Sequence, residues 1–229
     1  MKLYIGNKNY SSWSLRPWLT LKGLGIPFDE VQLQFDDFGP GSAFHAALDR
    51  LGAGVRKVPI LVEDDGFAVW ETLAIAEYIA DRHPELPVWP RDIKARTRAR
   101  SYCAEMHAGF GSIRNLCPMN IEAWFPEIGT RLLETEPGLR KDLARIDQIW
   151  SEALQASGGP FLFGKEFGAA DAYFAPVVMR ITRFALPLSP AAAAYAKTIE
   201  QLPAMQEWIA AALQEQSYVA EDEPYRKSR

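Results

Sequence analysis

The sequence predicts an α/β plus all-α protein, in which an N-terminal α/β domain precedes an all-helical domain. Strand and helix patterns alternate over roughly the first 80 residues, and the segment LPVWPR then interrupts them with two prolines. Every later periodic stretch has helical spacing. We place the α/β domain at 1–84, the linker at 85–91 and the helical domain at 92–229.

The N-terminal elements are predicted in the order β-α-β-α-β-β-α. They are a strand over 2–6, a helix over 14–25, a strand over 30–35, a helix over 42–50, a hairpin over 58–70 and a helix over 71–83. The hairpin is the clearest local signal, because Asp64-Asp65-Gly66 joins two short apolar runs. Gly25 and Pro27 end the first helix.

Amphipathic helical patterns fill the second domain. They cover 93–116, 138–157, 169–184 and 203–216, with a further helical segment at 191–194 and a polar tail at the end.

Composition excludes several classes of protein. The chain is 48% hydrophobic and 24% charged with a net charge of −4, so no basic excess predicts nucleic-acid binding. No apolar run approaches the ~20 residues of a membrane span. The N-terminus turns polar too early for a secretory signal. We expect a cytoplasmic protein that binds neither nucleic acid nor membrane.

The cysteines and histidines predict no metal site. Cys103 and Cys117 are far from any paired spacing, and we expect reduced packing residues. The histidines His45, His83 and His107 are scattered and form no ligand pattern.

Residues 10–18, YSSWSLRPW, place Ser11, Ser12, Ser14 and Arg16 at the start of the first helix. One hydroxyl is enough to cap a helix. The extra hydroxyls therefore indicate a further task at this turn.

Two later segments also carry candidate ligand contacts. Pro59 is either an ordinary strand-start proline or a cis-proline that turns the backbone of Val58 outward, toward an extended peptide. Glu71 and Thr72 begin a helix, where they serve as plain capping or as a site for the zwitterionic end of an amino acid.

Together these segments resemble the cytosolic glutathione transferases over nearly the whole chain. Residues 10–31 resemble the first strand-to-helix turn of serine-type members and are closest to the zeta class, and 56–85 resemble the family's cis-proline, hairpin and E-S-x-A-I segment. Residues 161–178 resemble its F-S-x-A-D segment, in which Asp171 supports the fold. The resemblance implies a thioredoxin-like first domain, a C2 homodimer and glutathione as co-substrate, with no metal.

The same resemblance implies roles for the serines. One hydroxyl donates to the glutathione thiolate, and the spacing to Arg16 ranks Ser12 slightly above Ser11. Ser14 is expected to cap the helix or support the site. Arg16 is expected to brace the loop through backbone carbonyls, with a surface cation as the alternative.

The glutathione contacts are also carried over from the resemblance. The backbone of Val58 would pair with the cysteinyl unit in a geometry fixed by Pro59. Glu71 and Thr72 would hold the γ-glutamyl end. Lys57 either reaches the glycyl carboxylate or stays solvated.

The chain departs from the family pattern in three places. Trp13 stands where the zeta class has cysteine, which weakens the transfer of that class's isomerase chemistry. Gly168 replaces a capping Ser or Thr, and residues 48–59 reshape one wall of the site. A thiol-transferring role is not expected, because the N-terminal domain holds no cysteine.

The electrophile pocket is expected between the domains. Met106, His107, Phe110 and Arg114 lie on roughly one face of the helix predicted over 93–116, and either line that pocket or pack in the core.

Two further parts of the chain bear on this pocket. Tyr218 and Tyr225 of the tail either close it or lie in a disordered end. If Arg180 or Arg183 lies near it, carboxylate-bearing substrates are favoured.

Three functions remain open on the sequence. The leading hypothesis is a glutathione transferase acting on a small hydrophobic electrophile. The alternatives are a glutathione-dependent isomerase (maleylacetoacetate-type) or peroxidase, and a non-catalytic stringent-starvation-type scaffold. The residues at 11–12, 58–59 and 71–72 argue against the scaffold, which has no use for a zwitterion site.

Overall fold

The computed structural model describes residues 1–35, 38–39 and 41–228. Its sheet has four strands in the order β2-β1-β3-β4. They are β1 (Lys2–Ile5), β2 (Asp29–Gln32), β3 (Ile60–Val62) and β4 (Ala68–Trp70). Strand β1 pairs in parallel with β2 and antiparallel with β3, and β4 completes the hairpin with β3.

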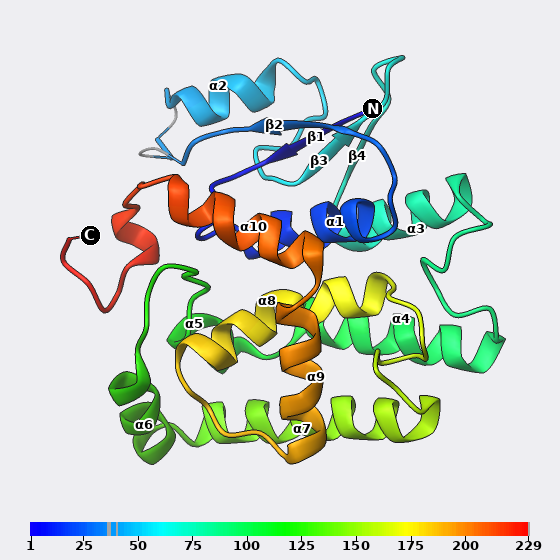
Figure 1. Cartoon of the computed structure of the whole chain (residues 1–229). Coiled ribbons are helices and arrows are strands. Elements are labelled where there is room, and N and C mark those ends of the chain that lie inside the picture. Colours follow the sequence, from blue (N-terminus) through cyan, green and yellow to red (C-terminus); the bar gives the residue numbers. More distant parts are fainter. Residues whose placement is uncertain (36–37, 40, 229) are drawn as a thin grey trace.

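Helices cover both faces of this sheet (Figure 1). Helix α2 (Ala43–Asp49) lies on the outer face, where Phe44 and Leu48 form a small core with Ile60. Helices α1 (Ser12–Gly23) and α3 (Thr72–Arg82) lie on the face toward the helical layer. The predicted order β-α-β-α-β-β-α is therefore confirmed.

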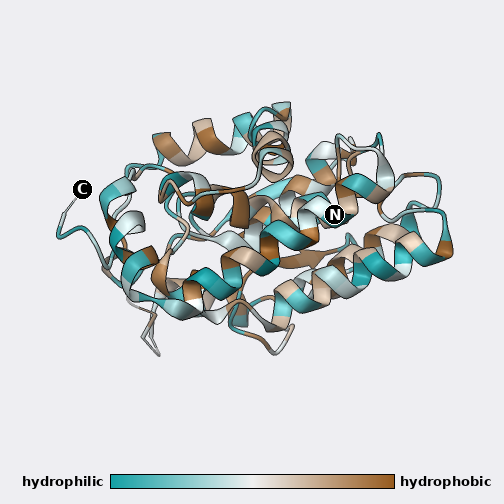
Figure 2. Ribbon diagram, turned by 90° about the horizontal axis from the view of Figure 1, so that it is seen from below, coloured by the Kyte–Doolittle hydropathy of each residue, from teal (hydrophilic) through white to brown (hydrophobic). Residues whose placement is uncertain are grey.

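The rest of the chain is helical. Its helices are α4 (Ile93–Ala108), α5 (Gly111–Leu116), α6 (Pro126–Thr135), α7 (Pro137–Ser157), α8 (Ala169–Arg183), α9 (Pro190–Glu200), α10 (Pro203–Gln214) and the short 3-10 helix η1 (Ala220–Asp222). Figure 2, which views the molecule from the helical side, shows hydrophilic and hydrophobic positions alternating along these helices, as amphipathic helices require.

The predicted helix over 93–116 is wrong as a single element. It ends at Ala108, and Phe110 then takes a left-handed conformation with φ of 59° before α5 begins. The sequence pattern continues across this break because both pieces are amphipathic. Helix α6 was not predicted, although Pro126 and Pro137 mark the first residues of α6 and α7.

Helix α8 is the centre of the helical layer and packs directly against α1. Its Asp171 is 1% exposed and accepts hydrogen bonds from the N–H of Leu162 and of Gly168, both at 3.0 Å, and from the Tyr195 hydroxyl at 3.2 Å. This carboxylate therefore ties the loop before α8 to α9. A Cβ at Gly168 would lie 2.9 Å from the carbonyl oxygen of Pro87, which explains why no larger residue stands there.

Cys103 and Cys117 are buried and unpaired, as predicted. Burial raises the pKa of Cys117 to about 12, so its thiol is not reactive at neutral pH. Within the described residues, the helices are all too short or too polar to cross a membrane.

Candidate active site

Two cavities adjoin at the junction of the domains. The first, of about 480 Å³, is lined by Trp13, Val55, Arg56, Lys57, Val58, Pro59, Trp70, Glu71, Thr72 and His107. The second, of about 420 Å³, contains Ser11 and Ser12 in its wall. Trp13 and residues 56–58 line both, so the two cavities adjoin along these residues, and Ser12 immediately precedes the shared Trp13.

The three serines of the first turn have different partners. Ser11 is the N-cap residue of α1, and its hydroxyl donates to Ser14 Oγ at 2.7 Å. Ser14 Oγ also accepts the N–H of Gly6 at 3.1 Å, so Ser14 ties α1 to the end of β1 and is not a cap. Ser12 Oγ instead faces Arg180, whose guanidinium donates to it at 3.3 Å.

Arg16 is buried beneath this turn. Its guanidinium donates to the carbonyl oxygens of Tyr173 at 3.0 Å and of Ser12 at 3.1 Å. It also lies 4.1 Å from the centre of the Trp13 ring and 4.8 Å from that of Tyr173. Burial lowers the pKa of Arg16 to about 9, so it remains charged at neutral pH and is not a surface cation.

The Val58–Pro59 peptide bond is cis. Ladder pairing between β1 and β3 begins at Ile60, so the backbone of Val58 lies beyond the paired residues and at the wall of the cavity. Lys57 is exposed at the rim.

Glu71 and Thr72 lie at the N-terminus of α3. Glu71 has a φ of 67°, an uncommon conformation for a side-chain-bearing residue, and it is exposed at the cavity wall. Helix capping was one of the two predicted roles of Thr72, but the N-cap residue of α3 is Glu71. The Oγ1 of Thr72 lies 2.8 Å from the hydroxyl of Tyr173, and what this residue presents to the cavity is the first turn of α3.

His107 extends this chain of polar groups. Its Nδ1 lies 2.7 Å from the Tyr173 hydroxyl, and its Nε2 lies 3.7 Å from a carboxylate oxygen of Glu71. Burial lowers the pKa of His107, and its Nδ1 and the Tyr173 hydroxyl form a hydrogen bond. Tyr173 therefore connects both sides of the first cavity.

The second cavity is lined by both apolar and charged side chains. Its other lining residues are Tyr10, Phe35, Phe38, Phe44, Pro118, Met119, Arg114, Arg180 and Asp222. Arg180 is 9% exposed, and burial lowers its pKa to about 10, so it is charged at neutral pH. Burial raises the pKa of Asp222 to about 6, although Arg180 opposes this shift.

Two of the expected pocket residues are not there. Met106 and Phe110 are 1% and 7% exposed, pack in the main core and line neither cavity. The break at Phe110 removes the shared helix face on which the expectation rested. His107 lines the first cavity and Arg114 the second.

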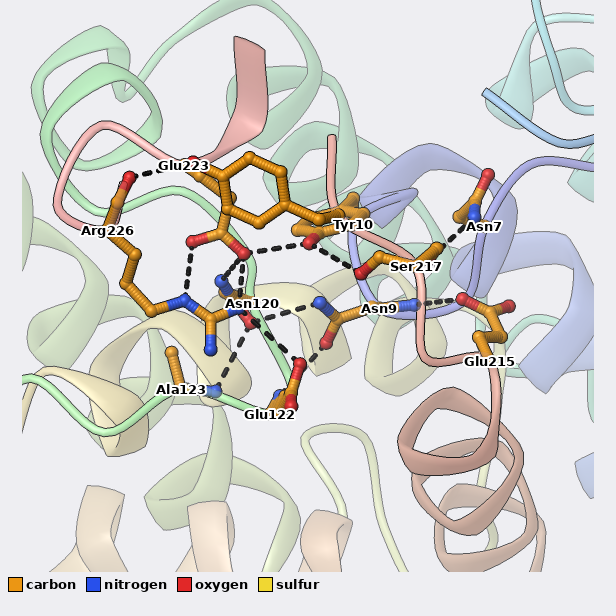
Figure 3. Close-up of polar contacts among 11 residues, drawn as sticks. Asn7, Asn9, Tyr10, Asn120, Glu122, Ala123, Glu215, Ser217, Glu223 and Arg226 are labelled. Atoms are coloured by element: carbon orange, nitrogen blue, oxygen red, sulfur yellow. Dashed lines mark hydrogen bonds and ion pairs between the residues drawn. The ribbon is translucent and has the colours of Figure 1, made fainter. Parts of the chain in front are cut away.

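The C-terminal tail is bonded to the loop that precedes the serines (Figure 3). Glu215 accepts the backbone N–H groups of Lys8 and Asn9, at 2.5 and 3.2 Å. Tyr10 donates to Glu223 at 2.7 Å, which also accepts from Asn120 at 2.8 Å. The tail is therefore held in place by these hydrogen bonds, which contradicts the predicted alternative of a disordered end.

Tyr218 and Tyr225 do not line either cavity. The Tyr225 hydroxyl donates to the Leu116 carbonyl, and that of Tyr218 to the Arg226 carbonyl. The tail contributes Asp222 to the site in their place.

Comparison with known proteins identifies the family. The glutathione S-transferase N-terminal domain model matches residues 10–82, and the C-terminal domain model matches 122–211. The chain belongs to the glutathione S-transferase family. The resemblance inferred from the sequence is confirmed, and so is the fold of a thioredoxin-like domain followed by an all-helical one.

Similar proteins include transferases and isomerases. Maleylacetoacetate isomerase of Rattus norvegicus is 27% identical over 188 residues, covering 82% of this chain and 81% of the relative. A glutathione transferase structure from Methylococcus capsulatus is 26% identical with a TM-score of 0.65, covering 93% and 98% of the two chains. A bacterial zeta-class maleyl pyruvate isomerase is 22% identical with a TM-score of 0.65, covering 92% and 98%. These findings indicate a glutathione-dependent enzyme, not a scaffold.

Some residues of this transferase site were not predicted. Tyr173 and Asp222 had no local signal, since Tyr173 lies inside a helix and Asp222 in a polar tail. The sequence did not place Arg180 or Arg183 relative to the pocket. In the structure Arg180 lines the second cavity, and Arg183 lines neither cavity. Among the described residues, no cluster of His, Cys, Asp and Glu is arranged to hold a metal ion.

Proposed function

We propose that this glutathione transferase activates the glutathione thiol as a thiolate through Ser12, for attack on a small electrophile. The observation that carries the proposal is the position of Ser12 in the wall of the second cavity, next to Trp13, which lines both cavities. Ser11 is the weaker candidate, because its proton is donated to Ser14. Within the part of the chain that the structure describes, Ser12 Oγ donates to no protein acceptor.

The energy required is within reach of one hydroxyl. An ordinary thiol has a pKa of ~8.5, and lowering it by about two units requires roughly 2.7 kcal/mol of differential stabilisation. A hydrogen bond to a charged group contributes ~1.5–3 kcal/mol. Serine then acts as a donor to the sulfur, which is the nucleophile.

The first cavity would hold glutathione. Its volume of about 480 Å³ suits a small-molecule site. The backbone of Val58, beside cis Pro59, would pair with the cysteinyl peptide unit, and Lys57 would face the glycyl end. The α3 N-terminus at Thr72 suits the γ-glutamyl carboxylate, and the exposed Glu71 carboxylate suits its ammonium group.

The second cavity would hold the electrophile. Its aromatic lining residues favour an electrophile with an apolar body, and the charged Arg114 and Arg180 favour an acidic group on it. A purely apolar electrophile, the leading expectation from the sequence, therefore fits less well. A homodimer and a cytoplasmic location are also part of this proposal and rest on family membership.

Isomerisation of a carboxylate-bearing cis-alkene is the second candidate. The two arginines favour it, together with the curated relatives named maleylacetoacetate isomerase. Both reactions use the same thiolate. Transfer consumes glutathione because the sulfur keeps its new bond to carbon, whereas isomerisation returns the thiol when that bond breaks again.

Glutathione binding is tested first, by retention on glutathione-agarose and by the thermal shift in millimolar glutathione. We expect retention and a stabilising shift, both weakened in Glu71→Gln and unchanged in Glu134→Gln, which is exposed on α6. Glutathione is then assayed during turnover of a nitro-activated aryl chloride and of a maleyl-type carboxylate. Absence of both binding signals would overturn the proposal.

A further inference from the structure

Arg180 reaches the candidate catalytic hydroxyl from the other domain. It lies near the end of α8, is 9% exposed and lines the second cavity together with Ser12. No carboxylate lies within ion-pair distance of its guanidinium among the described residues. Asp222, which lines the same cavity beyond that distance, only partly offsets the effect of burial on the pKa of Arg180. A buried charge without a close partner is costly, so its position calls for a reason.

The guanidinium is held in place by backbone carbonyls. One terminal nitrogen donates to the carbonyl oxygens of Arg114 at 3.1 Å and Cys117 at 2.6 Å, at the end of α5. The other terminal nitrogen donates to Ser12 Oγ at 3.3 Å. The two backbone carbonyls therefore hold one terminal nitrogen in place, and the other terminal nitrogen points at Ser12.

This contact decides the role of the Ser12 hydroxyl. A guanidinium has only donors, so Ser12 Oγ must be the acceptor. The hydroxyl proton is then free to point at another acceptor, which in this site is a group inside the cavity. At the other end of the same residue, Arg16 fixes the Ser12 carbonyl at 3.1 Å.

We propose that Arg180 is a positioning residue for Ser12: it occupies Oγ as a donor and so directs the hydroxyl proton toward the glutathione sulfur. This inference rests on the proposed function of Ser12. It adds a contribution from α8, a helix of the opposite domain, to the activation of the thiol.

The test measures the thiol titration of bound glutathione, followed by thiolate absorbance against pH, with turnover in parallel. We expect Arg180→Met to raise the thiol pKa by about one unit. From a wild-type pKa of ~6.5 this leaves about a third of the thiolate at pH 7. Arg180→Lys should restore part of this loss. The matched control is Arg183→Met, one turn further along α8, which should titrate as the wild type does.

A double-mutant cycle separates positioning from a direct effect of charge. In a Ser12→Ala background, Arg180→Met should cause little further change. The same shift in both backgrounds would show that Arg180 acts on the sulfur directly, and would overturn the inference. The inference would also be overturned if Ser12→Ala shifted the thiol pKa of bound glutathione and Arg180→Met did not.

Failure of the proposed function gives a different result. In that case the wild type itself shows no bound glutathione or an ordinary thiol titration, and both proposals fall. Should Arg180→Met not fold, Arg180→Gln is measured in its place, because its shorter amide still bonds a carbonyl at the end of α5. If the thiol of bound glutathione has the same pKa in Arg180→Gln as in the wild type, the inference is contradicted.

Discussion

The hydroxyl of Tyr10 lies 2.7 Å from a carboxylate oxygen of Glu223, 213 positions later in the chain. Tyr10 immediately precedes Ser11, and the carboxylate of Glu223 also forms an ion pair with Arg226. The bond therefore joins the C-terminal tail to the turn that carries the candidate catalytic serines (Figure 3).

Loss of this bond should loosen that turn. We expect Tyr10→Phe to lower the free energy of unfolding by about 1–2 kcal/mol, because a buried carboxylate loses a donor. Turnover should fall several-fold. Urea denaturation and the glutathione assay measure the two effects. Tyr218→Phe is the control, since its hydroxyl bonds a carbonyl at the exposed surface and should matter little. Equal effects of the two variants would contradict a special role for Tyr10.

The two serines should differ sharply. Ser12→Ala should lower kcat/KM by about 100-fold, the equivalent of roughly 2.7 kcal/mol. Ser11→Ala removes only the donor to Ser14, and should cost a few-fold. Steady-state kinetics of both variants with one electrophile decide the ranking. If Ser11→Ala alone abolishes turnover, the assignment to Ser12 is wrong.

Asp171 should support the fold, and do so in a pH-dependent way. Asp171→Asn replaces one carboxylate oxygen by an NH2 group that cannot accept. At least one of the three donors then loses its acceptor, and the free energy of unfolding should fall by about 1–3 kcal/mol. Burial raises the pKa of this carboxyl from 3.8 to about 6. The folded chain therefore holds its proton more tightly than the unfolded chain does.

The sign of the pH effect follows from that shift. Stability from the Asp171 proton is present in full below about pH 4 and is lost as the pH rises through about 6. The advantage of the wild type over Asp171→Asn should therefore be larger near pH 4 than near pH 7. Urea denaturation across this range checks it, and an advantage that grows with pH would contradict it.

Restoring the family's usual cap residue should destabilise this chain. In Gly168→Ser the new Cβ would lie 2.9 and 3.1 Å from the carbonyl oxygens of Pro87 and Val88. Since these are backbone atoms of the linker, we expect a loss of about 1–3 kcal/mol, as for overpacking. Thermal unfolding measures it. Gly111→Ser, with open space around its Cβ, is the control and should change stability by less than about 0.5 kcal/mol. A stabilised Gly168→Ser would show that capping outweighs the collision.

Local patterns were sufficient for the elements of the first domain. The turn Asp64-Asp65-Gly66 and the alternation around it predicted the hairpin of β3 and β4. Hydrophobic periodicity alone did not locate the helix break at Phe110, because both flanking helices keep an apolar face. Such a break depends on the packing of α5, which the sequence pattern does not contain.

The candidate site was predictable where its residues are close in sequence. The turn at 11–16, the pair at 58–59 and the pair at 71–72 each carry a local signature, and the structure brings them to one pair of cavities. Tyr173 contacts Thr72 across 101 positions, and Arg180 contacts Ser12 across 168. No periodicity or turn chemistry encodes contacts of that separation.

The sequence by itself determined the order of the elements in the first domain, the family and the three serines at the start of α1. Only the tertiary structure decided which serine hydroxyl still has a proton to donate to a ligand. The direction of each hydrogen bond depends on the partner that folding supplies. Ser14 provides that partner for Ser11 from the same helix turn. Arg180 provides it for Ser12 from the opposite domain, and that contact exists only when α1 and α8 are packed together.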